Sequence, residues 1–139
     1  MSAMNRKEFL YSLGTGALAA GCSTLLSACA GLSYATGRMV EDEFELLLSE
    51  LEGRPWVMVD LGGDRAPVLV TIESGAPLAI SLRCTHRGCT VEPGGTELEC
   101  PCHGSRYTME GKLLGGPAPR DLETYPVRQQ DGALYIRVR

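Results

Sequence analysis

The chain has 139 residues, which is enough for one domain and little more. Its formal net charge of −4 argues against nucleic acid as a partner, because a polyanion selects for clustered Lys and Arg. Seventeen Gly, eight Pro and an aromatic fraction of only 6% favour a turn-rich β fold over a helical bundle. Six cysteines are too many for ordinary packing in so short a chain, so their positions need an explanation.

Residues 1–29 have the pattern of an export signal. The basic pair Arg6-Lys7 stands just before residues 9–32, an uncharged stretch rich in Gly, Ala and Ser. A basic segment followed by a weakly apolar one is typical of a secretory signal. The spacing of the basic pair from the Phe-Leu that follows resembles a twin-arginine signal with Lys in the second position. We therefore expect twin-arginine export, a route that carries folded proteins.

The end of this segment, Leu26-Ser27-Ala28-Cys29, resembles a bacterial lipobox. In a lipobox the Cys thiol takes a diacylglycerol and becomes the first residue after cleavage, so we expect lipidation at Cys29. Cys22 is a poorer candidate and would be removed with the signal. Two or three acyl chains would anchor the protein stably. An uncleaved anchor is an alternative, since residues 9–32 are long enough to span a bilayer, and soluble export is another. Residues 30–39 would form a tether.

The remaining residues predict β structure. Residues 40–52 fit both a helix face and a strand, and we favour a short strand followed by a turn at Gly53. A hairpin and a third strand follow, and a second hairpin around Asp131-Gly132 closes the chain. Residues 83–120 are dense in Gly, Pro, Cys and His, which predicts loops around a site. The later predicted strands are Trp56–Leu61, Pro67–Glu73, Leu78–Leu82, Tyr125–Gln129 and Ala133–Val138.

Two short boxes hold the residues that can carry chemistry. The chain has only two histidines, and each lies in a box with cysteines, so each box can turn a thiolate and an imidazole toward one centre. Two thiolates and two imidazoles suit a single tetrahedral zinc or a two-iron cluster. The boxes are Cys84-Thr85-His86-Arg87-Gly88-Cys89 and Cys100-Pro101-Cys102-His103-Gly104-Ser105-Arg106-Tyr107.

The boxes resemble the C-x-H-x-G-C and C-x-C-H-G-S motifs of the Rieske iron–sulfur family. The resemblance runs from about Trp56 to the C-terminus. It implies an all-β fold, an antiparallel β-sandwich with a small loop-rich cluster-binding subdomain at about 83–120 within a domain spanning 40–139. It also implies one Rieske-type [2Fe–2S] cluster per chain. The implied ligands are the thiolates of Cys84 and Cys100 and the imidazoles of His86 and His103.

Other residues are assigned by the same resemblance. Cys89 and Cys102 match a disulfide that ties the two loops in the quinol-oxidising branch, which requires an oxidising compartment. The hydroxyls of Ser105 and Tyr107 match positions that hydrogen-bond the cluster in high-potential members. Gly115-Gly116-Pro117-Ala118-Pro119 resembles the family's proline loop, and we expect Pro117 to tune the cluster from a third side.

The resemblance implies one-electron transfer at high potential by an exported, membrane-tethered carrier or redox-complex subunit, with a redox protein as partner. Two alternatives are the quinol-oxidising subunit of a cytochrome bc-type complex and the small subunit of a periplasmic molybdenum oxidoreductase. Arg87 departs from the quinol-oxidising pattern, where an apolar residue is usual. An oxygenase needs a further iron site, and no further His is present to build one in this chain. A structural zinc module is the remaining alternative.

Overall fold

The computed structural model describes residues 34–138, which form three antiparallel β-sheets and one short 3-10 helix, η1 (Leu48–Leu51). The predicted export signal, the lipidation site Cys29 and the first part of the predicted tether lie outside the described residues. Within residues 34–138, no helix is long and apolar enough to cross a membrane. The predicted all-β class is confirmed.

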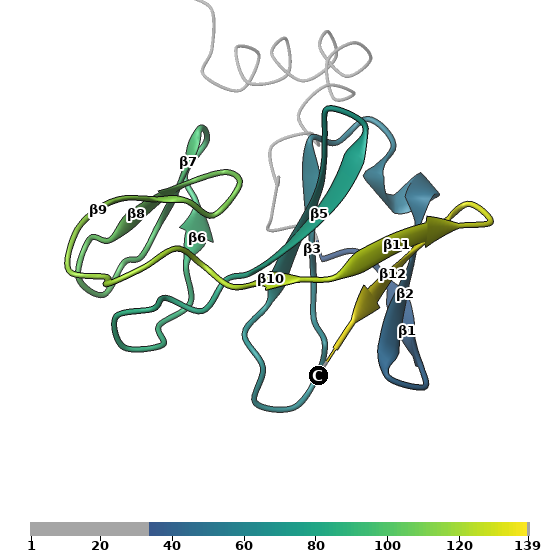
Figure 1. The fold of residues 1–139 in the computed structure, drawn as a ribbon, viewed down its shortest axis with the longest axis horizontal. Coiled ribbons are helices and arrows are strands. Elements are labelled where there is room, and N and C mark those ends of the chain that lie inside the picture. Colours follow the sequence, from purple (N-terminus) through teal and green to yellow (C-terminus); the bar gives the residue numbers. More distant parts are fainter. Residues whose placement is uncertain (1–33, 139) are drawn as a thin grey trace, which may run out of the picture. The chain divides into compact units, whose positions relative to one another are not determined.

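The strands are arranged in three groups of four (Figure 1). The first sheet has the order β1 (Gly37–Val40), β2 (Glu43–Leu47), β12 (Ala133–Arg137) and β11 (Val127–Gln130). The second has the order β10 (Thr124–Tyr125), β5 (Ala76–Ser81), β4 (Val68–Glu73) and β3 (Trp56–Val59). The third has the order β6 (Glu92–Pro93), β7 (Glu97–Glu99), β8 (Arg106–Thr108) and β9 (Leu113–Gly115).

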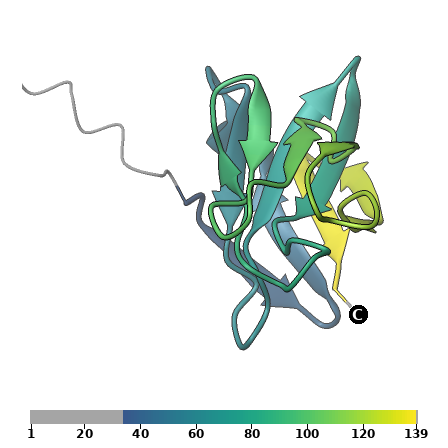
Figure 2. The same ribbon diagram turned by 90° about the vertical axis from the view of Figure 1, so that its left-hand side faces the viewer.

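The second sheet is buried on both faces. Its residues alternate between two apolar cores, as the two-residue period of a strand requires. Leu69 belongs to one core and its neighbours Val68 and Val70 to the other. The first core joins this sheet to β2 and β12, and the second joins it to β7 and β8. Each fully buried Val or Leu contributes about 1.5 to 3 kcal/mol, so the second core fixes the small third sheet on the sandwich. Figure 2 views the molecule from the side of that sheet.

Both predicted hairpins are present. β3 pairs antiparallel with β4, with Val59 opposite Val68, and β11 pairs with β12 around a turn at Asp131-Gly132. The segment 40–52 contains the predicted strand, β2, but its end winds into η1 before the turn at Gly53, where φ is +71°.

The structure differs from the sequence-based expectation in two places. Residues 34–39, expected to belong to the tether, pack on the sandwich: Ala35 is buried, its N–H donates to the carbonyl of Met58 at 2.7 Å, and β1 begins at Gly37. The 83–120 segment, expected to be loops, contains the four strands of the third sheet. These strands have only two or three residues each, which is too short for an alternation of side chains to be recognised.

Candidate metal centre

The two boxes form loops that close in the same way. In the first loop (residues 84–89), the N–H of Cys84 donates to the carbonyl of Cys89, and the N–H of Gly88 donates back to Cys84, both at 2.8 Å. In the second loop (residues 100–105), Cys100 bonds the carbonyl of the last residue at 2.8 Å, and the N–H of Gly104 donates back to Cys100 at 2.9 Å. Each loop needs Gly at its fifth position, where φ is +77° and +71°.

This loop geometry brings all four predicted ligands together. Cys84 and Cys100 start the loops and are 3% and 1% exposed, while His86 is half-buried and His103 is exposed. The two imidazole rings meet edge to face with centroids 4.7 Å apart. The site therefore has a buried sulfur side and a partly open imidazole side.

One atom of this site lacks a partner. The Nδ1 of His86 is buried and has no hydrogen bond to any of the described residues. An unsatisfied buried polar atom costs about 1 to 3 kcal/mol, and coordination to a metal would satisfy it. The donor set of two thiols and two imidazoles thus fits a metal centre on its own chemistry.

The thiols of Cys84 and Cys100 affect each other's ionisation. Burial opposes ionisation of Cys84, but hydrogen bonds led by the Tyr107 hydroxyl and the His86 backbone outweigh it, so the pKa of Cys84 lies below its ordinary value. Burial raises the pKa of Cys100, and its hydrogen bond with Cys84 raises it further. The pKa values of the two thiols are thus shifted in opposite directions, and a cation beside them would favour the ionised form of both.

The remaining cysteines of the boxes are joined to each other. Cys89 and Cys102 form a disulfide with an S–S distance of 2.10 Å that links the first loop to the second, as predicted. The sulfur of Cys100 lies within 4.8 Å of both disulfide sulfurs. Because disulfide sulfurs are not thiolates, they are not metal ligands here. Their role is to hold the two loops at a fixed separation.

The two predicted tuning hydroxyls have different partners. Tyr107 is fully buried, and its hydroxyl lies 3.5 Å from Cys84 Sγ and 3.4 Å from Thr85 Oγ1. Ser105 is also fully buried, and its Oγ accepts a hydrogen bond from the N–H of Ala118 at 3.1 Å. Since Ser105 Oγ is the acceptor in that bond, its own proton remains available as a donor.

The predicted proline loop (residues 115–119) packs against the second loop. The backbone of Gly116, with φ +100°, is so close that an added Cβ would lie 2.5 Å from Ser105 Cα and 2.9 Å from Gly104 O. The hydrogen bond from Ala118 to Ser105 fixes the same contact. Pro117 itself is exposed, so it stiffens the loop rather than filling a core.

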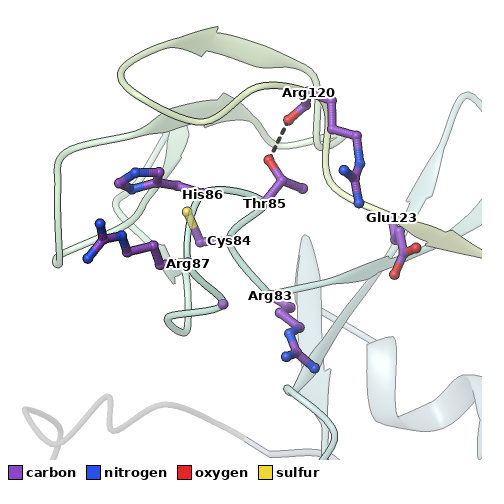
Figure 3. Close-up of a pocket in the computed structure, with 8 residues that line it drawn as sticks. Arg83, Cys84, Thr85, His86, Arg87, Arg120 and Glu123 are labelled. Atoms are coloured by element: carbon purple, nitrogen blue, oxygen red, sulfur yellow. Dashed lines mark hydrogen bonds between the residues drawn. The ribbon is translucent and has the colours of Figure 1, made fainter.

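A pocket of about 300 Å³ opens beside the first loop (Figure 3). Arg87 lies on the same side of it as the His86 ring, and Arg83 and Arg120 lie on the other side. The Thr85 hydroxyl donates to the carbonyl of Arg120 at 2.7 Å and so joins the two walls. Sequence reasoning missed Thr85, Arg83 and Arg120, because the last lies 35 residues beyond Thr85 and no motif connects them.

Comparison with known protein families agrees with a site of two thiols and two imidazoles. The family description "Rieske [2Fe-2S] domain" matches residues 45–126. The chain is 38% identical over 73 residues to the cytochrome b6-f complex iron-sulfur subunit of Chlorobaculum tepidum, covering 51% of this chain and 40% of that protein. It is 29% identical over 150 aligned residues to the cytochrome b6-f complex iron-sulfur subunit 2 of Trichormus variabilis, covering 96% and 84%.

Two solved structures share the fold. The cyanobacterial plasma membrane Rieske protein PetC3 from Synechocystis PCC 6803 superposes with a TM-score of 0.55 at 30% identity, over 66% of this chain and 95% of that one. The terminal oxygenase of carbazole 1,9a-dioxygenase from Novosphingobium sp. KA1 superposes with a TM-score of 0.51 at 32% identity, but only 28% of that chain is covered. The similarity to the oxygenase is thus confined to one part of it.

Proposed function

Because the chain belongs to the Rieske [2Fe–2S] family, we propose that it is a high-potential electron carrier tethered to a membrane outside the cytoplasm. It is a Rieske electron-transfer protein with a Rieske-type [2Fe–2S] cluster, related to cytochrome b6-f Rieske subunits. The observation that carries the proposal is the meeting of two buried thiols and two imidazoles, one with an unsatisfied Nδ1, in paired loops closed by a disulfide.

In this proposal Cys84 and Cys100 supply the thiolates, and His86 and His103 supply the imidazoles. When bound, the cluster supplies one-electron oxidation and reduction. The burial of both thiols supports the proposal, since it keeps water from the sulfur side. The exposure of His103 supports an exit for the electron on the imidazole side, where a partner can approach closely.

High potential is proposed from the hydroxyl at the sulfur side. A donor aimed at sulfur stabilises added negative charge and so favours the reduced state. The Tyr107 hydroxyl lies within reach of Cys84 Sγ, and the free proton of Ser105 provides a second donor in the same buried region. A reduction potential in the upper part of the roughly −150 to +300 mV range is therefore expected.

The export signal at residues 1–29, the tether from residue 30 and the lipid at Cys29 are proposals from the sequence. The disulfide supports an oxidising compartment, and the solved relative PetC3 is described as a plasma membrane protein. Expression with Cys29→Ser should shift the protein from the membrane fraction to the soluble fraction. The matched variant Cys22→Ser should leave it at the membrane, and equal release of both variants would argue against a lipid at Cys29.

The cluster and its ligands are tested by redox titration followed by electron spin resonance. The wild type should give a reduced-state signal and two irons per chain. The variants Cys84→Ser and His103→Ala should lose both, while Cys22→Ser should keep them. Retention of iron and signal in the ligand variants would refute the assignment, and bound zinc with no signal would replace it with a structural zinc site.

A second function is favoured by the curated relatives, which are cytochrome b6-f subunits. If this chain is the quinol-oxidising subunit of such a complex, it should copurify in mild detergent with a membrane cytochrome and accept electrons from a quinol there. Purification without such a cytochrome would favour the separate carrier.

A further inference from the structure

The pocket beside the first loop carries an unusual concentration of positive charge. Arg83, Arg87 and Arg120 line it, all three are exposed, and Glu123 is the single carboxylate among its lining residues. The chain as a whole has a net charge of −4. The pocket thus has the opposite sign to the rest of the molecule.

These three guanidinium groups have no ion-pair partner within residues 34–138. The ion pairs of the described residues use other cations, namely Arg38, Arg106, Lys112, Arg128 and Arg137. Arg54 and Arg65 also lack an ion-pair partner among the described residues, and neither lines the pocket. Unpaired guanidinium groups are therefore concentrated at this place.

The pocket walls are held in position by the fold. Arg83 lies against the first loop, where its Nε is 3.2 Å from the place a Cβ on Gly88 would occupy. Arg120 is fixed through its backbone carbonyl, which accepts the hydrogen bond from Thr85. Arg87 follows His86 directly in the chain and lies on the same side of the pocket as its ring (Figure 3). A negatively charged group in this pocket would therefore lie next to a proposed ligand.

We propose that this pocket is the docking site for a carboxylate cluster on the electron-transfer partner protein. Guanidinium groups form bidentate hydrogen bonds with carboxylates, and complementary charge raises the rate of encounter more than it raises affinity. Charged residues at the rim of a redox contact would orient the partner on the His86 side. The inference rests on the proposed electron-transfer function and adds to it the charge of the partner surface.

The test uses the cluster-loaded protein and two anionic probes. A fluorescein-labelled hexaglutamate peptide should bind the wild type at low ionic strength, as measured by fluorescence polarisation. Unlabelled hexaglutamate should slow the oxidation of the reduced protein by ferricyanide more than sodium chloride of equal ionic strength does. An equal effect of the peptide and the salt would overturn the proposal, leaving general screening only.

The variants locate the site. Each change Arg83→Gln, Arg87→Gln and Arg120→Gln should weaken peptide binding about two- to fivefold, and the triple change about tenfold or more. Glu123→Gln should strengthen it, because it removes the only carboxylate of the pocket. The double variant Arg54→Gln/Arg65→Gln is the matched control, since it removes unpaired cations elsewhere and should change binding by less than about twofold.

The outcomes separate this inference from the proposed function. If the triple variant keeps its electron spin resonance signal and potential but binds the peptide as the wild type does, the docking proposal is wrong and the electron-transfer proposal stands. If the wild type gives no reduced-state signal, the electron-transfer proposal itself is wrong. The cation tris(phenanthroline)cobalt(III), whose charge is opposite to that of ferricyanide, is the control oxidant. The rate at which the protein reduces it should not fall in the triple variant.

Discussion

Removal of the Tyr107 hydroxyl should lower the reduction potential. The ring is fully buried in the second core, so Tyr107→Phe keeps the packing and removes one hydrogen bond to Cys84 Sγ. A hydrogen bond to a charged acceptor is worth about 1.5 to 3 kcal/mol, and for a one-electron couple about 1.4 kcal/mol corresponds to 59 mV. Only the part of this energy that differs between the oxidised and reduced states shifts the potential, so the expected decrease is at most about 60 to 130 mV.

The neighbourhood of Tyr107 refines this range. The Thr85 hydroxyl donates to the Arg120 carbonyl, so toward Tyr107 it can only accept, and it competes with Cys84 for the tyrosine proton. We therefore expect the decrease in the lower half of the range.

The assay is protein-film voltammetry of wild type, Tyr107→Phe and the control Tyr125→Phe, whose ring packs on the other core. The control should keep the wild-type potential. An unchanged potential in Tyr107→Phe, with the cluster content intact, would refute the assignment of its hydroxyl to the sulfur side.

Three further predictions concern the stability of the site. Gly116→Ala places a Cβ 2.5 Å from the backbone of the second loop at a φ of +100°, so it should lower the melting temperature and the iron content. The control Gly115→Ala should change neither, because its Cβ would meet nothing nearer than 3.9 Å. Replacing Cys89 and Cys102 together by Ser should cost about 3 kcal/mol of unfolding free energy in a denaturant titration, and a loss below about 1 kcal/mol would mean that the loops are held mainly by other contacts. The pKa of Asp121 is lowered by the backbone N–H of Leu113 and then by the Lys112 side chain, so the charged carboxylate stabilises the fold above the ordinary carboxyl pKa. This contribution is lost as pH falls through the folded pKa, so Asp121→Asn should destabilise the protein at pH 7 and reach the stability of the wild type in acid. A stability difference that does not change with pH would exclude an electrostatic origin.

The sequence predicted the fold where strands were long enough to show a pattern. The runs that became β3, β4 and β5 are nearly continuously apolar, and this reflects the burial of that sheet on both faces. The third sheet could not be predicted, because its short strands are defined by pairing across loops and not by side-chain alternation. Residues 34–39 gave no signal either, since this short run of mixed large, small, apolar and polar residues suits a tether and an edge strand equally well.

At the site, motif spacing predicted which residues gather there but not how their surroundings connect. The loop glycines follow from the two boxes, whereas the disulfide was implied only by their resemblance to the Rieske family. The Thr85–Arg120 hydrogen bond and the Gly116 contact join segments that are distant in sequence, and each depends on how the proline loop is placed in three dimensions. Arg87 shows the limit most clearly: alone it indicates only a departure from a familiar pattern, and its proposed role depends on Arg83 and Arg120, which line the same pocket.

Three links together explain why the open side of this site can remain ordered. The disulfide from Cys89 joins the first loop to the second, and Ser105 joins the second loop to the proline loop. Thr85 joins the first loop to Arg120, the residue that follows the proline loop. The links form a closed ring of three segments, so any one of them can break while the other two still hold all three segments together. The contributions of the three links to stability are therefore not additive, since loss of a second link costs more free energy than loss of the first. It also allows His103 to stay exposed while the loop that carries it is held in place.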